Sequence, residues 1–127
     1  MLNVPPTIKI YVYTGPMDMR KGCNALGGIV RSEYKSDPTD GQLYLFINKR
    51  RDRLKILHFE DGGYWLYYRL LEAGTFEELA SPDATCPLEI DATQLVMLLS
   101  GVSLQGSTQR RKRFVRPTVA GRREDAA

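Results

Sequence analysis

Short apolar segments separated by turn residues predict a β-sheet in this chain. Residues 8–13 read IKIYVY and alternate apolar with polar side chains, which is the period of a half-buried strand. The predicted strands span residues 8–13, 43–48, 53–60 and 64–70, with 86–90 as a candidate fifth strand. Glu60-Asp61-Gly62-Gly63 is typical of a tight hairpin turn. Because three strands follow one another through short turns, we expect the sheet to be mainly antiparallel.

Apolar residues at steps of three and four predict a first helix near residues 17–35. Pro16 is suited to the first position of a helix, and Asp18 to the positive end of its dipole. Gly27 and Gly28 each lower helix stability by about 1 kcal/mol relative to alanine. This helix therefore depends on tertiary packing, with the sheet expected to lie very close to it.

A second helix is predicted near residues 91–102. Asp91 is placed as an N-cap, with Gln94 three positions later, which is the pattern of a capping box. The apolar face of this helix consists of Leu95, Leu98, Leu99 and Val102. The preceding stretch, 71–89, is irregular and contains a candidate short helix at residues 75–79.

These elements predict an α+β fold, in which a mainly antiparallel sheet of four to five strands packs against two helices. We expect residues 1–106 to form a single compact domain, since this length is sufficient for one hydrophobic core. Residues 107–127 are poor in apolar side chains and dense in like charge. We therefore expect them to be a basic C-terminal tail that is flexible when free.

Positive charge is concentrated towards the C-terminus. The chain has a net charge of +3, and residues 110–127 hold 7 of its 18 basic but only 2 of its 15 acidic residues. Residues 70–109 contain no Lys or Arg. A basic pole favours contact with an anionic polymer. No apolar run approaches the roughly 20 residues of a membrane helix, and no secretory signal is evident, so we expect a cytoplasmic protein, with association with the nucleoid as an option.

The segment between the second and third predicted strands is strongly basic. Its five cations, opposed only by Asp52, are Lys49, Arg50, Arg51, Arg53 and Lys55. A rigid sheet that presents a basic turn is suited to DNA, because Lys and Arg neutralise phosphates whatever the base sequence. On composition alone, a solvated hairpin turn explains the pattern equally well. Our first choices for phosphate contacts are Arg51, Arg53 and Lys55.

Two further basic groups are candidates for the same role. Arg20 and Lys21 lie at the start of the first predicted helix, where free backbone N–H groups can help to bind phosphate. The tail group consists of Arg110, Arg111, Lys112 and Arg113, followed by Phe114, which is available to stack on a base. The alternatives are a solvent-facing pair on the helix and a solubilising tail. Neither group specifies a base sequence.

Catalytic chemistry has little support in the sequence. His58 is the only histidine, so a metal site or a Ser-His-Asp triad would depend on one side chain in a predicted strand, where a packed histidine is favoured. Asp52, Glu60 and Asp61 lie at strand ends, where a metal-dependent nuclease could collect carboxylates, but acids are common in hairpin turns. The two cysteines lack CxxC spacing. We therefore predict a protein without catalytic residues, cofactor or bound metal.

Aromatic residues are concentrated in the predicted strand 64–70. They are Tyr64, Trp65, Tyr67 and Tyr68. Such residues can form a stacking platform for unpaired bases. Because one face of a strand in a sheet must be buried, core packing is favoured for at least two of them.

Several short motifs follow one another in a characteristic order over residues 8–104. They are Asp18-Met19-Arg20-Lys21-Gly22, the segments 46–57, 61–64 and 68–76, Gln94-Leu95 and the segment 98–102. In these motifs the chain resembles the small accessory protein, often called TnpB or the second-reading-frame protein, of bacterial transposable elements in the insertion sequence 66 family. Leu71 departs from the basic residue more typical of that family, which weakens the case for phosphate contacts by strand 64–70.

The resemblance implies a role in transposition beside a separate, larger transposase. We therefore expect a non-catalytic accessory protein that binds the DNA backbone, the transposase of the same element, or both. One alternative is a pure protein-interaction module, in which the acidic region 70–91 and exposed aromatic residues dock onto a basic transposase. The other is a small metal-dependent nuclease.

Overall fold

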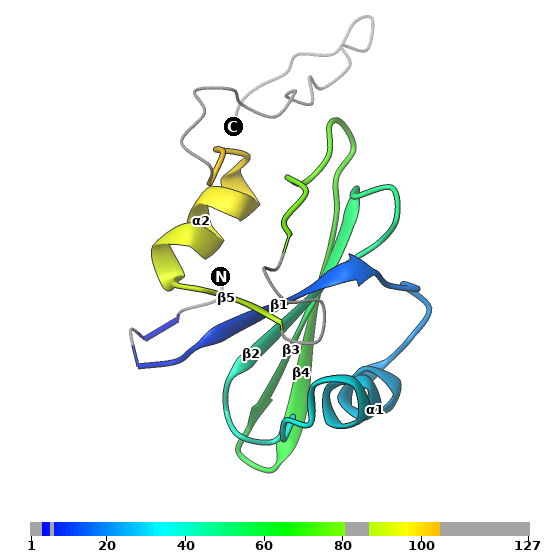
Figure 1. Ribbon diagram of the computed structural model, residues 1–127, viewed down its shortest axis with the longest axis vertical. Coiled ribbons are helices and arrows are strands. Elements are labelled where there is room, and N and C mark those ends of the chain that lie inside the picture. Colours follow the sequence, from blue (N-terminus) through cyan, green and yellow to red (C-terminus); the bar gives the residue numbers. More distant parts are fainter. Residues whose placement is uncertain (1–3, 6, 81–86, 105–127) are drawn as a thin grey trace, which may run out of the picture.

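The computed structural model describes residues 4, 5, 7–80 and 87–104, which form an α+β fold. Its elements in chain order are β1 (Ile10–Pro16), α1 (Cys23–Tyr34), β2 (Leu43–Ile47), β3 (Arg53–Glu60), β4 (Gly63–Leu70), β5 (Leu88–Ile90) and α2 (Ala92–Ser100). The strands form one sheet in the order β4-β3-β2-β1-β5 (Figure 1). The predicted fold class and all five predicted strands are confirmed. Neither helix of the described residues is long and apolar enough to cross a membrane.

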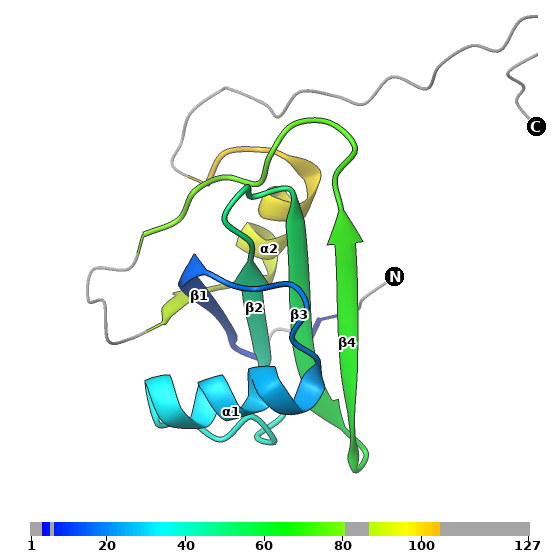
Figure 2. The same ribbon diagram turned by 90° about the vertical axis from the view of Figure 1, so that its right-hand side faces the viewer.

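The sheet combines one parallel strand pair with three antiparallel pairs. β1 and β2 are parallel and are connected through α1, whereas the β2–β3, β3–β4 and β1–β5 pairs are antiparallel. A parallel pair cannot be joined by a tight turn, so the chain must cross over one face of the sheet, and α1 lies in that crossover (Figure 2). β3 and β4 form the predicted hairpin through Asp61 and Gly62, both of which have positive φ.

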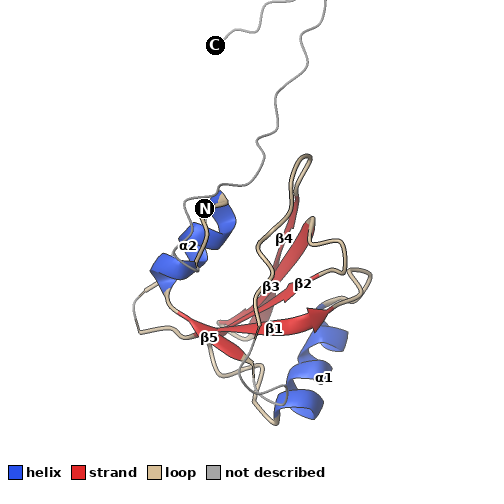
Figure 3. Cartoon of the chain, turned by 45° about the horizontal axis from the view of Figure 1, so that its top comes forward, coloured by secondary structure: helices blue, strands red, loops and turns tan. Residues whose placement is uncertain are grey.

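Alternating side chains place one apolar cluster on each face of the sheet. On one face, Leu26 of α1 packs with Phe46 of β2. On the other face, Leu98 of α2 packs with Leu45, the neighbour of Phe46 in the same strand. The two helices accordingly lie on opposite sides of the sheet (Figure 3). Both faces of the central strands are buried, which explains their almost continuous apolar sequence.

The first helix begins later than the sequence predicts. β1 continues through Pro16, and the backbone N–H of Met17 donates to the Ile47 carbonyl at 3.0 Å, which keeps the chain on the sheet. The Asp18 carboxylate accepts a hydrogen bond from the Arg20 backbone N–H in a local turn at 2.9 Å. The prediction that Pro16 starts the helix and Asp18 stabilises its dipole is therefore wrong, because pairing with β2 outweighs the local helix-start signal.

The predicted short helix at residues 75–79 is also wrong, because residues 75–80 have no regular secondary structure. The Phe76 N–H donates to the Arg51 carbonyl at 2.6 Å, and the Leu71 N–H donates to the Asp52 carbonyl at 2.7 Å. The side chain of Phe76 is 1% exposed and belongs to the cluster on the α2 face. The loop is thus fixed against the β2–β3 turn and the core, and these tertiary contacts replace helical hydrogen bonds.

The predicted capping box of α2 is confirmed. The Asp91 carboxylate accepts from the Gln94 N–H at 2.7 Å, and the Gln94 side chain accepts from the Asp91 N–H at 2.9 Å. The helix ends at Gly101, which has the left-handed φ of 84° that glycine adopts at low cost. The Arg69 guanidinium of β4 donates to the Leu99 carbonyl at 2.8 Å, which connects the end of α2 to the edge of the sheet.

The close approach of α1 to the sheet is confirmed at Gly27. A Cβ atom at this position would lie 3.3 Å from the Tyr64 hydroxyl and 3.6 Å from the Pro38 ring, whereas a Cβ at Gly28 would have no described neighbour within 4 Å. Packing therefore disfavours a larger residue at Gly27 but not at Gly28.

This difference gives a matched pair of substitutions. We expect Gly28→Ala to raise the free energy of unfolding by up to about 1 kcal/mol, since alanine favours helix and meets no neighbour. Gly27→Ala should gain less or destabilise, because the Tyr64 hydroxyl must move. Urea denaturation of both variants measures the difference, and equal gains would contradict the close packing.

Tyr44 of β2 predicts a stability loss at alkaline pH. Its side chain is buried, and its hydroxyl donates to the Asp40 carboxylate at 2.8 Å. Burial, together with that hydrogen bond, raises the pKa of the phenol above its ordinary value of 10.0. The folded state therefore favours the neutral phenol, and its stabilising effect is lost as the pH rises above 10. We expect Tyr44→Phe to cost about 1 kcal/mol at neutral pH but to show a smaller alkaline loss in urea denaturation.

Candidate nucleic-acid interface

The turn between β2 and β3 is held together by Asn48. Its side-chain oxygen accepts from the N–H groups of Asp52 and Arg53 at 3.1 and 3.0 Å, and its amide donates to the Asp52 carboxylate at 2.8 Å. Its backbone N–H donates to the Arg53 carbonyl at 3.1 Å, and Arg51 has the left-handed φ of 59° that closes the loop. The turn is therefore a rigid support for its side chains.

The cations of this turn fall into two groups in the structure. Lys49, Arg50 and Arg53 are exposed and have no ion pair with any other described residue. Arg51 and Lys55, two of the three residues favoured by the sequence, make contacts within the fold. The basic segment therefore presents three unpaired positive charges to solvent.

Arg51 faces the loop 71–80. Its guanidinium donates to the Glu78 carboxylate at 3.1 Å, and its carbonyl accepts from the Phe76 N–H at 2.6 Å. The ion pair is partly exposed, with the Arg51 side chain 39% and the Glu78 side chain 78% accessible. Its main effect is to neutralise the Arg51 charge locally and to direct the guanidinium away from the tip of the turn.

Lys55 connects the basic turn to the second predicted basic group. Its ammonium donates to the Lys21 carbonyl at 2.9 Å and lies over the Tyr68 ring, 5.3 Å from the ring centroid. The structure thus brings Lys21, Lys55 and Tyr68 together from three separate segments. Arg53 projects from the same face of β3 as Lys55, because side chains two positions apart in a strand point the same way.

Arg20 is engaged with Asp18, two residues before it. The two side chains form an ion pair at 2.8 Å, and hydrogen bonds from the Arg20 side chain lower the pKa of Asp18 to about 2. The structure places Arg20 and Lys21 just before α1, which begins at Cys23 with Gly22 as its N-cap. No described side chain caps the helix at Gly22, directly after Lys21, so the assistance of helical N–H groups in binding phosphate stays a prediction.

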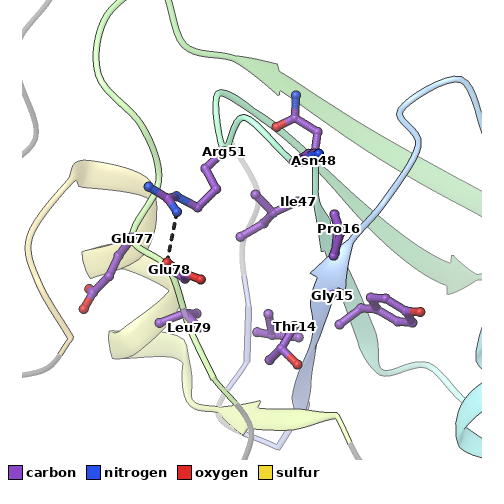
Figure 4. Close-up of a pocket in the computed structure, with 12 residues that line it drawn as sticks. Thr14, Gly15, Pro16, Ile47, Asn48, Arg51, Glu77, Glu78 and Leu79 are labelled. Carbon is purple, nitrogen blue, oxygen red and sulfur yellow. Dashed lines mark hydrogen bonds and ion pairs between the residues drawn. The ribbon is translucent and has the colours of Figure 1, made fainter. Parts of the chain in front are cut away.

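A hollow lies where the ends of β1 and β2 meet the loop 71–80 (Figure 4). Its cavity volume is about 200 Å³. Gly15, Pro16 and Ile47 form one side, and Arg51 extends towards Glu78 on the other. The charges that line the hollow are Lys49 and Arg51 against Glu77 and Glu78, which sum to zero, so the hollow has little preference for an anion.

Comparison with known proteins assigns the chain to a family. The family described as IS66 Orf2 like protein matches residues 8–109. The chain belongs to this family. A similar protein is the uncharacterized protein y4jC of Sinorhizobium fredii (strain NBRC 101917 / NGR234), 32% identical over 118 residues that cover 93% of this chain and 97% of that protein.

A second relative comes from the same strain. The uncharacterized protein y4hO is 29% identical over 102 residues, which cover 80% of this chain and 87% of that protein. No solved structure is significantly similar to the chain. The predicted resemblance to the insertion sequence 66 family is therefore confirmed, and membership associates this IS66 Orf2-like protein with transposition.

The carboxylates considered for a nuclease are separated in this IS66 Orf2-like protein. Asp52 precedes β3, whereas Glu60 ends that strand and Asp61 follows it. Eight residues of strand span roughly 26 Å, so Asp52 cannot share a metal ion with the other two. Among the described residues, no group of three His, Cys, Asp or Glu side chains is arranged to hold a metal. His58 is 8% exposed, which confirms the packed histidine.

Much of the acidic region 70–91 serves the fold itself. Glu78 pairs with Arg51, and the Glu77 carboxylate accepts from the Leu104 N–H at 2.7 Å and from the Ser103 hydroxyl at 3.2 Å. Asp91 caps α2. The other described acids of this region are Glu72 and Glu89. Of the five described carboxylates of this region, two are therefore left for a basic partner.

The aromatic residues of β4 do not form one platform. Tyr64 and Tyr67 are partly buried against opposite faces of the sheet, which confirms core packing for two of the four. Trp65 and Tyr68 are 54% and 51% exposed. They also point to opposite faces, because they are an odd number of positions apart. Only Tyr68 lies beside the basic residues.

The sequence alone does not single out Asn48 and Tyr68. An Asn at the start of a turn often bonds backbone N–H groups further along the chain, and this local signal could have identified Asn48. No local signal identifies Tyr68, whose contact with Lys55 depends on strand register. The tail cations Arg110 to Arg113 and the expected domain boundary after residue 106 lie outside the described residues, so they stay predictions.

Proposed function

We propose that this IS66 Orf2-like protein is a non-catalytic accessory factor in transposition that binds the DNA backbone through the β2–β3 turn. The observation that supports it is the division of the basic segment: Lys49, Arg50 and Arg53 remain exposed and unpaired on a rigid turn, while Arg51 and Lys55 are used in the fold. Three unpaired cations at one turn can neutralise phosphates and release their counterions.

The other predicted contacts have supporting roles in this proposal. Lys21 and Lys55 are partly buried and are joined by the hydrogen bond from the Lys55 ammonium to the Lys21 carbonyl. Lys55 is on the same face of β3 as Arg53, where it adds positive potential. Arg20 contributes less, since Asp18 neutralises it. The tail, with 7 basic residues from position 110 onwards, increases the association rate through its long-range field.

Salt-dependent binding of the full chain to a short DNA duplex tests this function. For three phosphate contacts by the turn, the logarithm of affinity should fall with the logarithm of salt concentration with a slope of at least about −2.7. An affinity that does not change between low and physiological salt would contradict the proposal. A chain that ignores DNA but co-purifies in high salt with the transposase of its element would favour the protein-interaction module instead.

A variant of the full chain separates the contribution of the tail to DNA binding from that of the turn. Changing Arg110, Arg111, Lys112 and Arg113 together to alanine removes four tail cations and leaves the turn intact. We expect weaker binding with a salt slope that still includes the turn contribution of about −2.7. Complete loss of salt-dependent binding in this variant would place the contacts in the tail and refute the role of the turn.

A further inference from the structure

β4 is a long, open edge of the sheet. It pairs with β3 through eight consecutive residue pairs, from Arg53–Leu70 to Glu60–Gly63, without a bulge. No described strand pairs with its outer side, and the opposite edge is the three-residue strand β5. β4 lies at one side of the sheet, with β3 as its only described neighbouring strand (Figure 2).

Edge strands usually carry features that prevent pairing with another chain, such as proline, several charges or a bulge. β4 has no proline, and Arg69 is its only charged residue. Three of its large apolar side chains are exposed, namely Trp65 (54%), Tyr68 (51%) and Leu70 (43%). An edge of this composition is suited to pairing with another strand.

The register determines which backbone groups of β4 are available. The Leu71 N–H donates to the carbonyl of Asp52, the residue opposite it. Antiparallel pairs alternate between hydrogen-bonded and non-hydrogen-bonded, so the odd-numbered residues of β4 bond to β3. The outward-facing N–H and C=O groups belong to Tyr64, Leu66, Tyr68 and Leu70.

We propose that β4 pairs antiparallel with β4 of a second copy of this chain, with Tyr67 opposite Tyr67. In this register Tyr64 faces Leu70 and Leu66 faces Tyr68, so all four outward-facing residues pair with one another. A shift by two residues in either direction leaves one of them without a partner from this set. In this register every outward-facing backbone N–H and C=O group of the strand therefore has a hydrogen-bond partner on the second copy.

The side chains support the same register. Arg69 lies opposite Trp65 of the second copy, where a guanidinium and an indole attract each other. Arg69, the only charged residue of the strand, thus does not lie opposite Arg69 of the second copy, and no like charges are brought together. An extended segment of another protein could also add to this edge, but the self-match in hydrogen bonding and charge favours a second copy.

The symmetry of this dimer follows from the strand direction. Antiparallel pairing of identical edges requires a two-fold axis perpendicular to the sheet, which keeps each face on the same side in both copies. The Arg53 and Lys55 side chains of both copies would therefore share one face of a ten-stranded sheet. Dimer formation does not depend on DNA binding and can be measured without DNA.

Two substitutions of Trp65 test both the interface and its register. Sedimentation equilibrium of the full chain, without DNA, should show a concentration-dependent dimer. Trp65→Lys places two like charges opposite each other at both symmetric positions and should raise the dimer Kd by about tenfold or more. Trp65→Glu removes the same indole but places a carboxylate opposite Arg69, so its Kd should stay well below that of Trp65→Lys.

Circular dichroism checks that both variants fold, as expected at a position that is 54% exposed. A wild-type chain that stays monomeric at all concentrations would overturn the proposal. Equal Kd values for the two variants would do the same, because the register requires their charges to act in opposite directions. Since the readout is self-association, its failure is distinct from a failure of DNA binding by the turn.

Discussion

Replacing Lys49, Arg50 and Arg53 together by alanine is expected to weaken DNA binding by about two orders of magnitude near physiological salt. Each lost phosphate contact removes a factor of about five at that salt concentration, if counterion release is taken to vanish near 1 M. The fold should be unaffected, because the three side chains are exposed and none pairs with another described residue. Fluorescence anisotropy with a labelled duplex measures the change.

A matched variant removes the same charge elsewhere on the surface. Lys9, Arg31 and Lys35 are exposed and lie outside the basic turn. Lys9→Ala and Arg31→Ala can be combined with Lys35→Asn, since Lys35 has the left-handed φ of 53° that Asn tolerates. This control should bind DNA with only a small loss. If both triple variants weaken binding equally, net charge and not the turn determines affinity.

The second large effect concerns Phe76. Phe76→Ala is expected to lower the free energy of unfolding by about 3–5 kcal/mol, because it leaves a cavity in the cluster on the α2 face. This is a large share of the roughly 5–15 kcal/mol typical of a small domain. Urea denaturation followed by circular dichroism measures the change.

Val96→Ala is the control for Phe76→Ala. Val96 is 63% exposed on α2, so its truncation should change the free energy of unfolding by less than about 0.5 kcal/mol. A loss at Phe76 as small as that at Val96 would show that the loop 71–80 is not fixed in the core. In that case the loop would not support the β2–β3 turn either.

Local patterns predicted the elements whose determinants lie within a few residues. The β3–β4 hairpin follows from Asp61-Gly62, and the start of α2 follows from Asp91 and Gln94. The start of α1 could not be predicted in this way, because the Met17 N–H bonds to Ile47, thirty residues away, and extends β1 past the helix signal. The prediction of a helix at residues 75–79 failed for the same reason, since Phe76 is fixed by the core and by Arg51.

The candidate site was predicted as a segment but not as a set of contacts. The basic composition of residues 49–55 is plain in the sequence. Which cations remain free depends on partners distant in the chain, namely Glu78 for Arg51, and Lys21 and Tyr68 for Lys55. Strand order is equally non-local, so the open edge at β4 became visible only with the sheet assembled.

The salt dependence of DNA binding by the wild type and by the Lys49, Arg50 and Arg53 triple alanine variant tests the proposed interface most directly. Counterion release assigns about 0.9 of slope to each phosphate contact, so the variant should be less steep by about 2.7. This difference counts contacts and does not depend on overall affinity or on the tail, which both proteins share. Equal slopes in the two proteins would show that these three cations do not touch the DNA backbone.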